Sequence, residues 1–243
     1  MVDQLKRSND RKTTPMANTK GVASKIKNTF GLPAGREFSC PGETTFCGAR
    51  CYGKRIENYL PSVRALLTHN WNLVREASYG DLVIMLDSMI NDFVKDCDKH
   101  SADKMFRIHW DGDFFSLEYT RAWAQVVRSY PDVQFWAYTR NPEAAAFLSE
   151  SQLANLGLYF SADEDNDKIA KSLRDTFGIR IATLAETFDD AKLLHMEITG
   201  DRVGKCPEVA GKIPLITING GACKSCALCP TAKTDITFST SSK

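Results

Sequence analysis

The stretch "MFRIHWDGDFFSLEYTRAWAQVVRSYPDVQFWAY", residues 105–138, changes its hydrophobic pattern twice. Its two ends, 105–110 and 133–138, are short and rich in aromatic and β-branched residues, which is typical of buried strands. Between them Ser116 is placed to cap a helix over 116–130. The apolar face of that helix consists of Tyr119, Trp123, Val126 and Val127. A strand, a helix and a second strand at this spacing predict a βαβ unit with parallel strands.

The same alternation continues on both sides of this unit. Strands are predicted at 24–35, 156–161, 179–184 and 212–218, and helices at 60–78, 81–99, 142–148, 165–177 and 187–196. About six such units predict an α/β fold, a partial (β/α)6 TIM-like barrel followed by a cysteine-rich segment. We therefore divide the chain into a basic flexible N-terminal tail (1–29), the barrel with a first cysteine loop (30–200), and a C-terminal cysteine-rich segment (201–243).

Composition and net charge argue against some classes of function. The 243 residues are 43% apolar and carry a net charge of +1, which is typical of an ordered globular protein without an overall attraction to nucleic acid or membrane. The basic tail is interpreted as a solvated segment, with a nucleic-acid arm as the alternative. No segment approaches the ~20 apolar residues of a membrane span. A cytoplasmic location is expected, where the eight cysteines stay reduced.

Polar residues follow the predicted strands where parallel α/β folds place their chemistry. The acidic turn Asp111-Gly112-Asp113 comes directly after the strand 105–110, Arg140 follows the next strand, and Ser161 ends the one after that. Asp163 and Asp165 lie just beyond Ser161 and are equally well explained as caps of the next helix. We interpret the acidic turn as functional, because it comes directly after a buried strand and is harder to explain as helix caps.

The C-terminal cysteines have the spacing of a cluster-binding loop. Cys223, Cys226 and Cys229 form a C-x2-C-x2-C run, with Cys206-Pro207 upstream. Bacterial ferredoxins bind iron–sulfur clusters with such a run, whereas zinc sites usually pair two C-x2-C knuckles. The pattern favours a [4Fe-4S] cluster, with zinc as the alternative.

The first cysteine group has only three members, Cys40, Cys47 and Cys51. Three thiolates on a four-iron cluster leave one iron open to an external ligand. Zinc would need a fourth ligand such as His69 or His109. The two groups could also combine into one cluster that joins the chain ends. The remaining thiol, Cys97, is interpreted as a buried small hydrophobe.

In this order, the three-cysteine loop, the acidic glycine turn and the later βα units resemble the radical S-adenosylmethionine (SAM) enzymes. The resemblance implies a partial barrel of the radical SAM type, with a [4Fe-4S] cluster on Cys40, Cys47 and Cys51. The turn at 111–113 would hold the SAM amino group, Arg140 would balance its charges, and Ser161 would meet the ribose. The later cysteines would hold an auxiliary cluster.

The stretches "GLPAG", "CPGETTFCGARCYG", "RIHWDGDFFSLEYTRAW", "FWAYTR" and "CKSCALCP" resemble a phage family named after gene product eighty-eight, over roughly 30–230. This resemblance implies a viral protein with iron–sulfur chemistry and an unassigned reaction. Three functions follow: a SAM-dependent radical or redox enzyme, a non-catalytic iron–sulfur sensor or host-protein binder, and a zinc-stapled nucleic-acid-binding protein. A small-molecule or host-protein partner is expected in the host cytoplasm, and no membrane partner.

Overall fold

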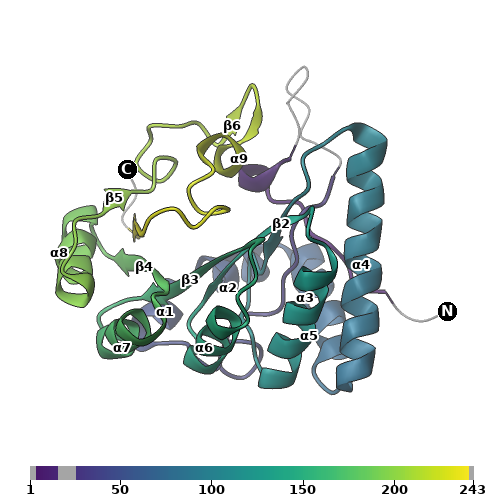
Figure 1. Ribbon diagram of the computed structural model, residues 1–243, viewed down its shortest axis with the longest axis horizontal. Coiled ribbons are helices and arrows are strands. Elements are labelled where there is room, and N and C mark those ends of the chain that lie inside the picture. Colours follow the sequence, from purple (N-terminus) through teal and green to yellow (C-terminus); the bar gives the residue numbers. More distant parts are fainter. Residues whose placement is uncertain (1–3, 16–25, 241–243) are drawn as a thin grey trace.

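The structure is a computed structural model that describes residues 4–15 and 26–240. Its centre is a parallel six-stranded sheet with the order β1-β2-β3-β4-β8-β5 (Figure 1). The strands are β1 Met105–Ile108, β2 Gln134–Thr139, β3 Leu156–Ala162, β4 Arg180–Ala185, β5 Gly204–Lys205 and β8 Ile236–Ser239. This confirms the predicted α/β class with a parallel sheet. The finer assignment to a radical-SAM barrel stays a prediction.

Helices alternate with these strands along the chain. They are α1 Thr45–Arg50, α2 Tyr52–Tyr59, α3 Pro61–Val74, α4 Tyr79–His100, α5 Leu117–Ser129, α6 Pro142–Glu150, α7 Asp167–Phe177, α8 Phe188–Thr199 and α9 Ala222–Cys226, with a short 3-10 helix η1 at Arg11–Thr13. Helices α5, α6 and α7 lie next to one another along one face of the sheet (Figure 1). Helix α1 lies within the first cysteine loop, and α2 begins directly after Cys51.

Successive side chains of a strand point to opposite faces of the sheet, and each face has its own apolar cluster. Phe106 and Phe135 face the helices and pack with Trp123 of α5 in the largest apolar cluster. Trp136, the next residue of β2, belongs instead to a smaller cluster on the opposite face, together with Tyr159 and Cys229. The face of the sheet that carries no helices α5–α7 is thus covered by the C-terminal cysteine segment.

The predicted first strand lies beside β1. Arg107 donates its N–H to the carbonyl of Asn28 (3.0 Å), and Trp110 donates to Phe30 (2.9 Å). A parallel bridge joins Thr29 to Arg107. The extended segment from 26 to 32 thus continues the sheet beyond β1, while residues 24 and 25 of the prediction lie outside the described residues.

The predicted closing strand at 212–218 is wrong. Only Ile216–Thr217 (β6) is extended there, and it pairs antiparallel with Gly220–Gly221 (β7) in a separate hairpin. The place in the sheet belongs to β8, which pairs with both β4 and β5. A strand between two others must bury its residues, and Ile236 and Thr237 are buried whereas Ile216 and Thr217 remain half-buried.

The N-terminal tail also differs from its prediction where the structure describes it. Residues 4–15 pack against the sheet: Leu5 is buried, and Arg7 pairs with Asp96 at 2.6 Å. Asp10 pairs with Arg107 of β1 at 3.1 Å. Apolar burial and two ion pairs fix this segment although its composition is polar. Residues 1–3 and 16–25 of the expected tail lie outside the described residues.

Two further expectations can be compared with the structure. Cys97 is completely buried in α4, as predicted. Within the described part of the chain, no helix combines the length and apolarity that a membrane crossing requires.

Candidate functional site

A cavity of about 1100 Å³ opens beside the sheet, and both cysteine groups line it. Its wall includes Cys40, Cys47, Cys51, Cys206, Cys223 and Cys229. The predicted polar residues Asp111, Gly112, Asp113, Arg140 and Ser161 line the same cavity. Cys226, the remaining predicted ligand, belongs to α9 and does not line it. The structure therefore brings together two motifs that lie more than 150 positions apart in the sequence.

The first cysteine group is held by two consecutive helix starts. Thr44 caps α1, and its Oγ1 accepts a hydrogen bond from the N–H of Cys47 (3.0 Å). Cys51 caps α2, and its Sγ accepts from the N–H of Lys54 (3.5 Å). Burial raises the pKa of the Cys47 and Cys51 thiols, so both are protonated at neutral pH in the absence of a metal.

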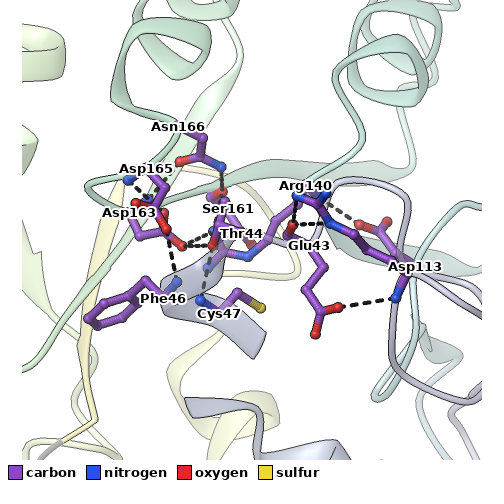
Figure 2. A network of polar contacts seen from close by, with 11 residues as sticks. Glu43, Thr44, Phe46, Cys47, Asp113, Arg140, Ser161, Asp163, Asp165 and Asn166 are labelled. Carbon is purple, nitrogen blue, oxygen red and sulfur yellow. Dashed lines mark hydrogen bonds and ion pairs between the residues drawn. The ribbon is translucent and has the colours of Figure 1, made fainter. Parts of the chain in front are cut away.

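A buried polar network fastens α1 to the strand ends (Figure 2). The carboxylate of Asp163, which follows β3, accepts a hydrogen bond from Thr44 Oγ1 (2.7 Å) and pairs with Arg140 Nη1 (2.5 Å). Asp165 accepts from the N–H of Phe46 (2.9 Å). The sequence left Asp163 and Asp165 undecided between capping and function. In the structure they position the helix that carries Cys47.

Arg140 and Ser161 belong to this network. The Arg140 guanidinium pairs with Asp163 and also donates to the carbonyl of Ser161 (3.1 Å). Asn166 donates to the same carbonyl (3.1 Å). Arg140 therefore carries an ion pair of its own, which the sequence did not predict, and its assignment to a bound cofactor stays a prediction.

The two acids of the turn differ in their surroundings. Asp113 accepts hydrogen bonds from the N–H groups of Phe114 and Arg140, both at 2.7 Å, so its carboxylate fixes the backbone. Burial raises the pKa of Asp113 to about 6 although these hydrogen bonds act against the shift. Asp111 accepts from Gly112 (3.0 Å) through Oδ1, and among the described residues no donor reaches its Oδ2.

Asp111 is enclosed by the first cysteine group. A Cβ on Gly53, two residues after Cys51, would collide with the Asp111 carboxylate. Only glycine allows α2 to approach so closely. Burial raises the pKa of Asp111, and the neighbouring charge of Glu57 adds to the rise. Asp111 is thus held in its protonated form more strongly than Asp113.

The C-terminal group lies against the aromatic face of the sheet. Cys206 follows β5 and donates its N–H to Thr237 (2.9 Å), while Cys223 lies in α9. Burial raises the pKa of Cys223 to about 12; Arg107 opposes this rise, and the neighbouring thiols of Cys229 and Cys206 add to it. Burial likewise raises the pKa of Cys229 to about 11. These thiols are close enough to influence one another's ionisation.

Arg107, which the sequence analysis did not single out, lies between the two cysteine groups. Its guanidinium pairs with Asp10, donates to the Tyr52 hydroxyl (3.4 Å) and stacks over the Tyr138 ring at 5.7 Å. Tyr52 follows Cys51 directly, and Arg107 also acts on the pKa of Cys223. A charged residue in the middle of a buried strand was the signal that could have found it.

The donor chemistry fits a soft metal centre, but the ligand geometry is not assembled. Within residues 4–15 and 26–240, no three His, Cys, Asp or Glu side chains gather as a set that could hold a metal ion. His69 and His109, considered as fourth zinc ligands, each make a hydrogen bond to another group, and His109 lines the cavity. His69 bonds to the carbonyl of Gln4, and His109 bonds to Tyr119 within an aromatic cluster that lowers its pKa to about 3 by burial.

The sequence matches a protein-family model described as Gene product 88 over residues 3–232. The chain belongs to the gene product 88 family. The Gene 88 protein of Mycobacterium phage L5 is 47% identical over 243 residues, covering 99% of both chains. The Gene 88 protein of Mycobacterium phage D29 is also 47% identical, over 98% of this chain and 99% of its own. No solved structure matches.

These matches extend the resemblance found in the sequence. They support a phage origin for this member of the gene product 88 family, and the names of the two relatives state no activity.

Proposed function

We propose that this protein binds iron–sulfur clusters through the two cysteine groups that line its central cavity, in the cytoplasm of an infected host. The observation that supports the proposal is the position of six thiols in the wall of one cavity. Thiolates are the ligands that iron–sulfur clusters use, and cytoplasmic thiols are not consumed by disulfides. The [4Fe-4S] type follows from the C-x2-C-x2-C run.

Each group has a distinct part in this proposal. Cys206, Cys223, Cys226 and Cys229 would supply four thiolates to one cluster. Cys40, Cys47 and Cys51 would supply three to another, which leaves one iron for an external ligand such as SAM. A bound cluster supplies one-electron chemistry. The alternative to two clusters is a single cluster that both groups share. This arrangement is compatible with the structure because both groups line the same cavity.

The residues around the thiols prepare the site. Trp136 and Tyr159 cover the C-terminal group with apolar surface and exclude water. Arg107 brings a positive charge beside Cys223, which favours anionic ligands there. Asp111 places a buried carboxyl group beside the first group. The C-terminal group is thus surrounded by aromatic side chains and a positive charge, whereas the first group lies beside polar side chains.

The non-catalytic alternative, a redox sensor or host-protein binder, has its own support. The Asp113 carboxylate is occupied by two backbone N–H groups. It is therefore not free to bind the amino group of SAM, and the acidic turn has a structural task. The zinc-stapled nucleic-acid-binding alternative has less support, since His69 is bonded to the carbonyl of Gln4 and His109, although it lines the cavity, is bonded to Tyr119 through its Nε2.

Metal analysis tests the central proposal. Protein purified without oxygen should contain iron and acid-labile sulfide in about equal amounts, with the visible absorption of an iron–sulfur centre. Cys226→Ser should lower the iron content, and Cys97→Ala, at a thiol buried in α4, should leave it unchanged. Stoichiometric zinc without sulfide would contradict the proposal, and so would equal iron in both variants.

A second measurement separates the enzyme from the non-catalytic protein. SAM is titrated calorimetrically into the reduced protein, and 5′-deoxyadenosine is assayed in parallel. Asp111→Asn should weaken binding, because it removes an ionisable carboxyl group whose Oδ2 has no hydrogen-bond partner among the described residues. If no heat and no 5′-deoxyadenosine are detected in protein that contains iron and sulfide, the sensor or binder alternative is favoured.

A further inference from the structure

The cavity has an uneven charge distribution. Eight cations line it, and five of these have acidic partners: Arg7 pairs with Asp96, Lys12 with Glu208, Arg50 with Glu186, Arg107 with Asp10, and Arg140 with Asp163. The other three are Arg11, Lys27 and Arg55. In the part of the chain that the structure describes, none of the three has an ion pair with an acid. All three are exposed at the rim.

The acids of the cavity do not offset these three charges. Asp10 and Glu208 are already paired with lining cations, and Glu43 pairs with Lys54. Asp111 and Asp113 are buried, and each is only 5% exposed. The rim is therefore electropositive, whereas the acids are buried below it. An anionic group entering the cavity meets three cations that have no competing partner.

The wall also offers aromatic surface. Tyr52, Trp110, Trp136 and Tyr138 line the cavity. Tyr52 is 48% exposed, and its hydroxyl donates a hydrogen bond to the backbone carbonyl of Trp110. Planar rings stack on such residues without requiring a particular hydrogen-bond pattern. The volume of about 1100 Å³ lies just above the range that is usual for small-molecule sites, about 300–1,000 Å³.

We infer that the cavity binds a nucleoside phosphate, with its phosphates at Arg11, Lys27 and Arg55 and its base against the aromatic wall. Unpaired cations select the phosphate, and the aromatic wall selects the base. The ligand is either a free nucleotide or the phosphorylated end of a single strand, because both present the same chemistry. This inference goes beyond cluster binding and does not require it.

Calorimetric titration tests the inference with three probes on the purified protein. ATP should bind, while adenosine, which lacks phosphate, and pyrophosphate, which lacks a base, should each bind at least about tenfold more weakly. The ATP affinity should fall as salt is raised, because the rim charges are exposed. If ATP binds no more tightly than adenosine and pyrophosphate, the inference is overturned.

Charge-neutralising variants locate the site. Arg55→Gln should weaken ATP about tenfold and leave adenosine unchanged. Arg121→Gln is the matched control, because it removes the same charge from α5, outside the cavity. Equal loss of ATP affinity in the two variants would overturn the placement at the rim. Tyr52→Leu should weaken ATP and adenosine alike.

A 5′-phosphorylated single-stranded hexanucleotide distinguishes the two sources. Tighter binding than ATP, with the same sensitivity to Arg55→Gln, supports a strand end; tighter binding of ATP supports a free nucleotide. Binding of neither probe overturns the inference. Iron and sulfide analysis of the same protein remains independent of this outcome, so failure here leaves the cluster proposal standing.

Discussion

The two cysteine groups face one cavity but are held in different ways. The first group sits on α1 and α2, and Thr44, Asp163 and Arg140 tie it to the strand ends by polar contacts (Figure 2). The second group lies on the aromatic face of the sheet with Trp136 and Tyr159. Directional contacts fix the orientation of a side chain, whereas apolar packing excludes water. The orientation of the first group is thus fixed by polar contacts, and the second group is shielded from water by aromatic side chains.

The largest effect is expected at the anchor of the first group. Asp163→Ala leaves Arg140 buried without its partner, and such a loss costs about 3–5 kcal/mol of unfolding free energy. Denaturant unfolding should show this decrease. Asp165→Ala, at an exposed position that contacts Phe46, should cost about 1 kcal/mol. Equal costs at the two positions would show that the buried ion pair does not fasten the first group.

The acidic turn should make stability depend on pH. The pKa of Asp113 is raised from 3.8 to about 6 in the folded protein, so the folded state holds its proton longer than the unfolded state. The contribution of Asp113 is therefore fully present below pH 4 and is lost as the pH rises toward 6. The loss is on the order of 3 kcal/mol.

Thermal unfolding of wild type and Asp113→Asn across this range checks the effect. The stability difference between the two proteins should change between pH 4 and pH 6, because only the wild type titrates at this position. If the stability difference stays constant with pH, the pKa of Asp113 is not raised in the folded protein.

The second group should respond to a change in packing rather than in charge. A Cβ on Gly157 of β3 would lie 2.5 Å from the carbonyl oxygen of Pro230 and 2.6 Å from that of Cys229. Gly157→Ala should push the cysteine segment off the sheet and cost about 1–3 kcal/mol.

Alkylation of the cysteines checks this displacement. Cys229 should react faster with iodoacetamide in Gly157→Ala than in wild type, while the reactivity of Cys47 should stay the same. Gly204→Ala serves as a control, because a Cβ there meets no atom within 4 Å. Faster reaction of both cysteines would indicate general unfolding rather than a local effect on the second group.

The smallest effect is expected at the rim. Arg50 of α1 pairs with Glu186, and both side chains are about half exposed. Exposed pairs contribute about 0–1 kcal/mol, so Arg50→Gln should change the unfolding free energy by less than about 1 kcal/mol. A larger loss would mean that the first group depends on its surface contacts as much as on Asp163.

Local pattern predicted much of this fold. Residues 105–138 form the predicted strand, helix and strand, because burial and spacing agree over that stretch. The strand-end rule also placed Asp111, Arg140 and Ser161 at one cavity. The position of β8 could not be predicted, since its four residues carry no signal that distinguishes them from Ile216–Thr217. Their place in the sheet depends on long-range pairing.

The sequence indicated which residues line the cavity, but it did not indicate the contacts that hold them there. The cysteine spacing identified both groups, but no local pattern indicates that Asp163 reaches back to Thr44 across 119 positions. The packing of residues 4–15 was missed for the same reason. Its partners Asp96 and Arg107 are distant in sequence, so composition alone described the segment as solvated.

The position of β8 has a consequence for biosynthesis. Because β8 lies between β4 and β5, the sheet cannot be completed until residues 236–239 have left the ribosome. The strands β1 to β4 and the first cysteine group emerge earlier, with one side of the sheet still uncovered. The cavity that both cysteine groups line is therefore complete only after the C-terminal segment has been synthesised.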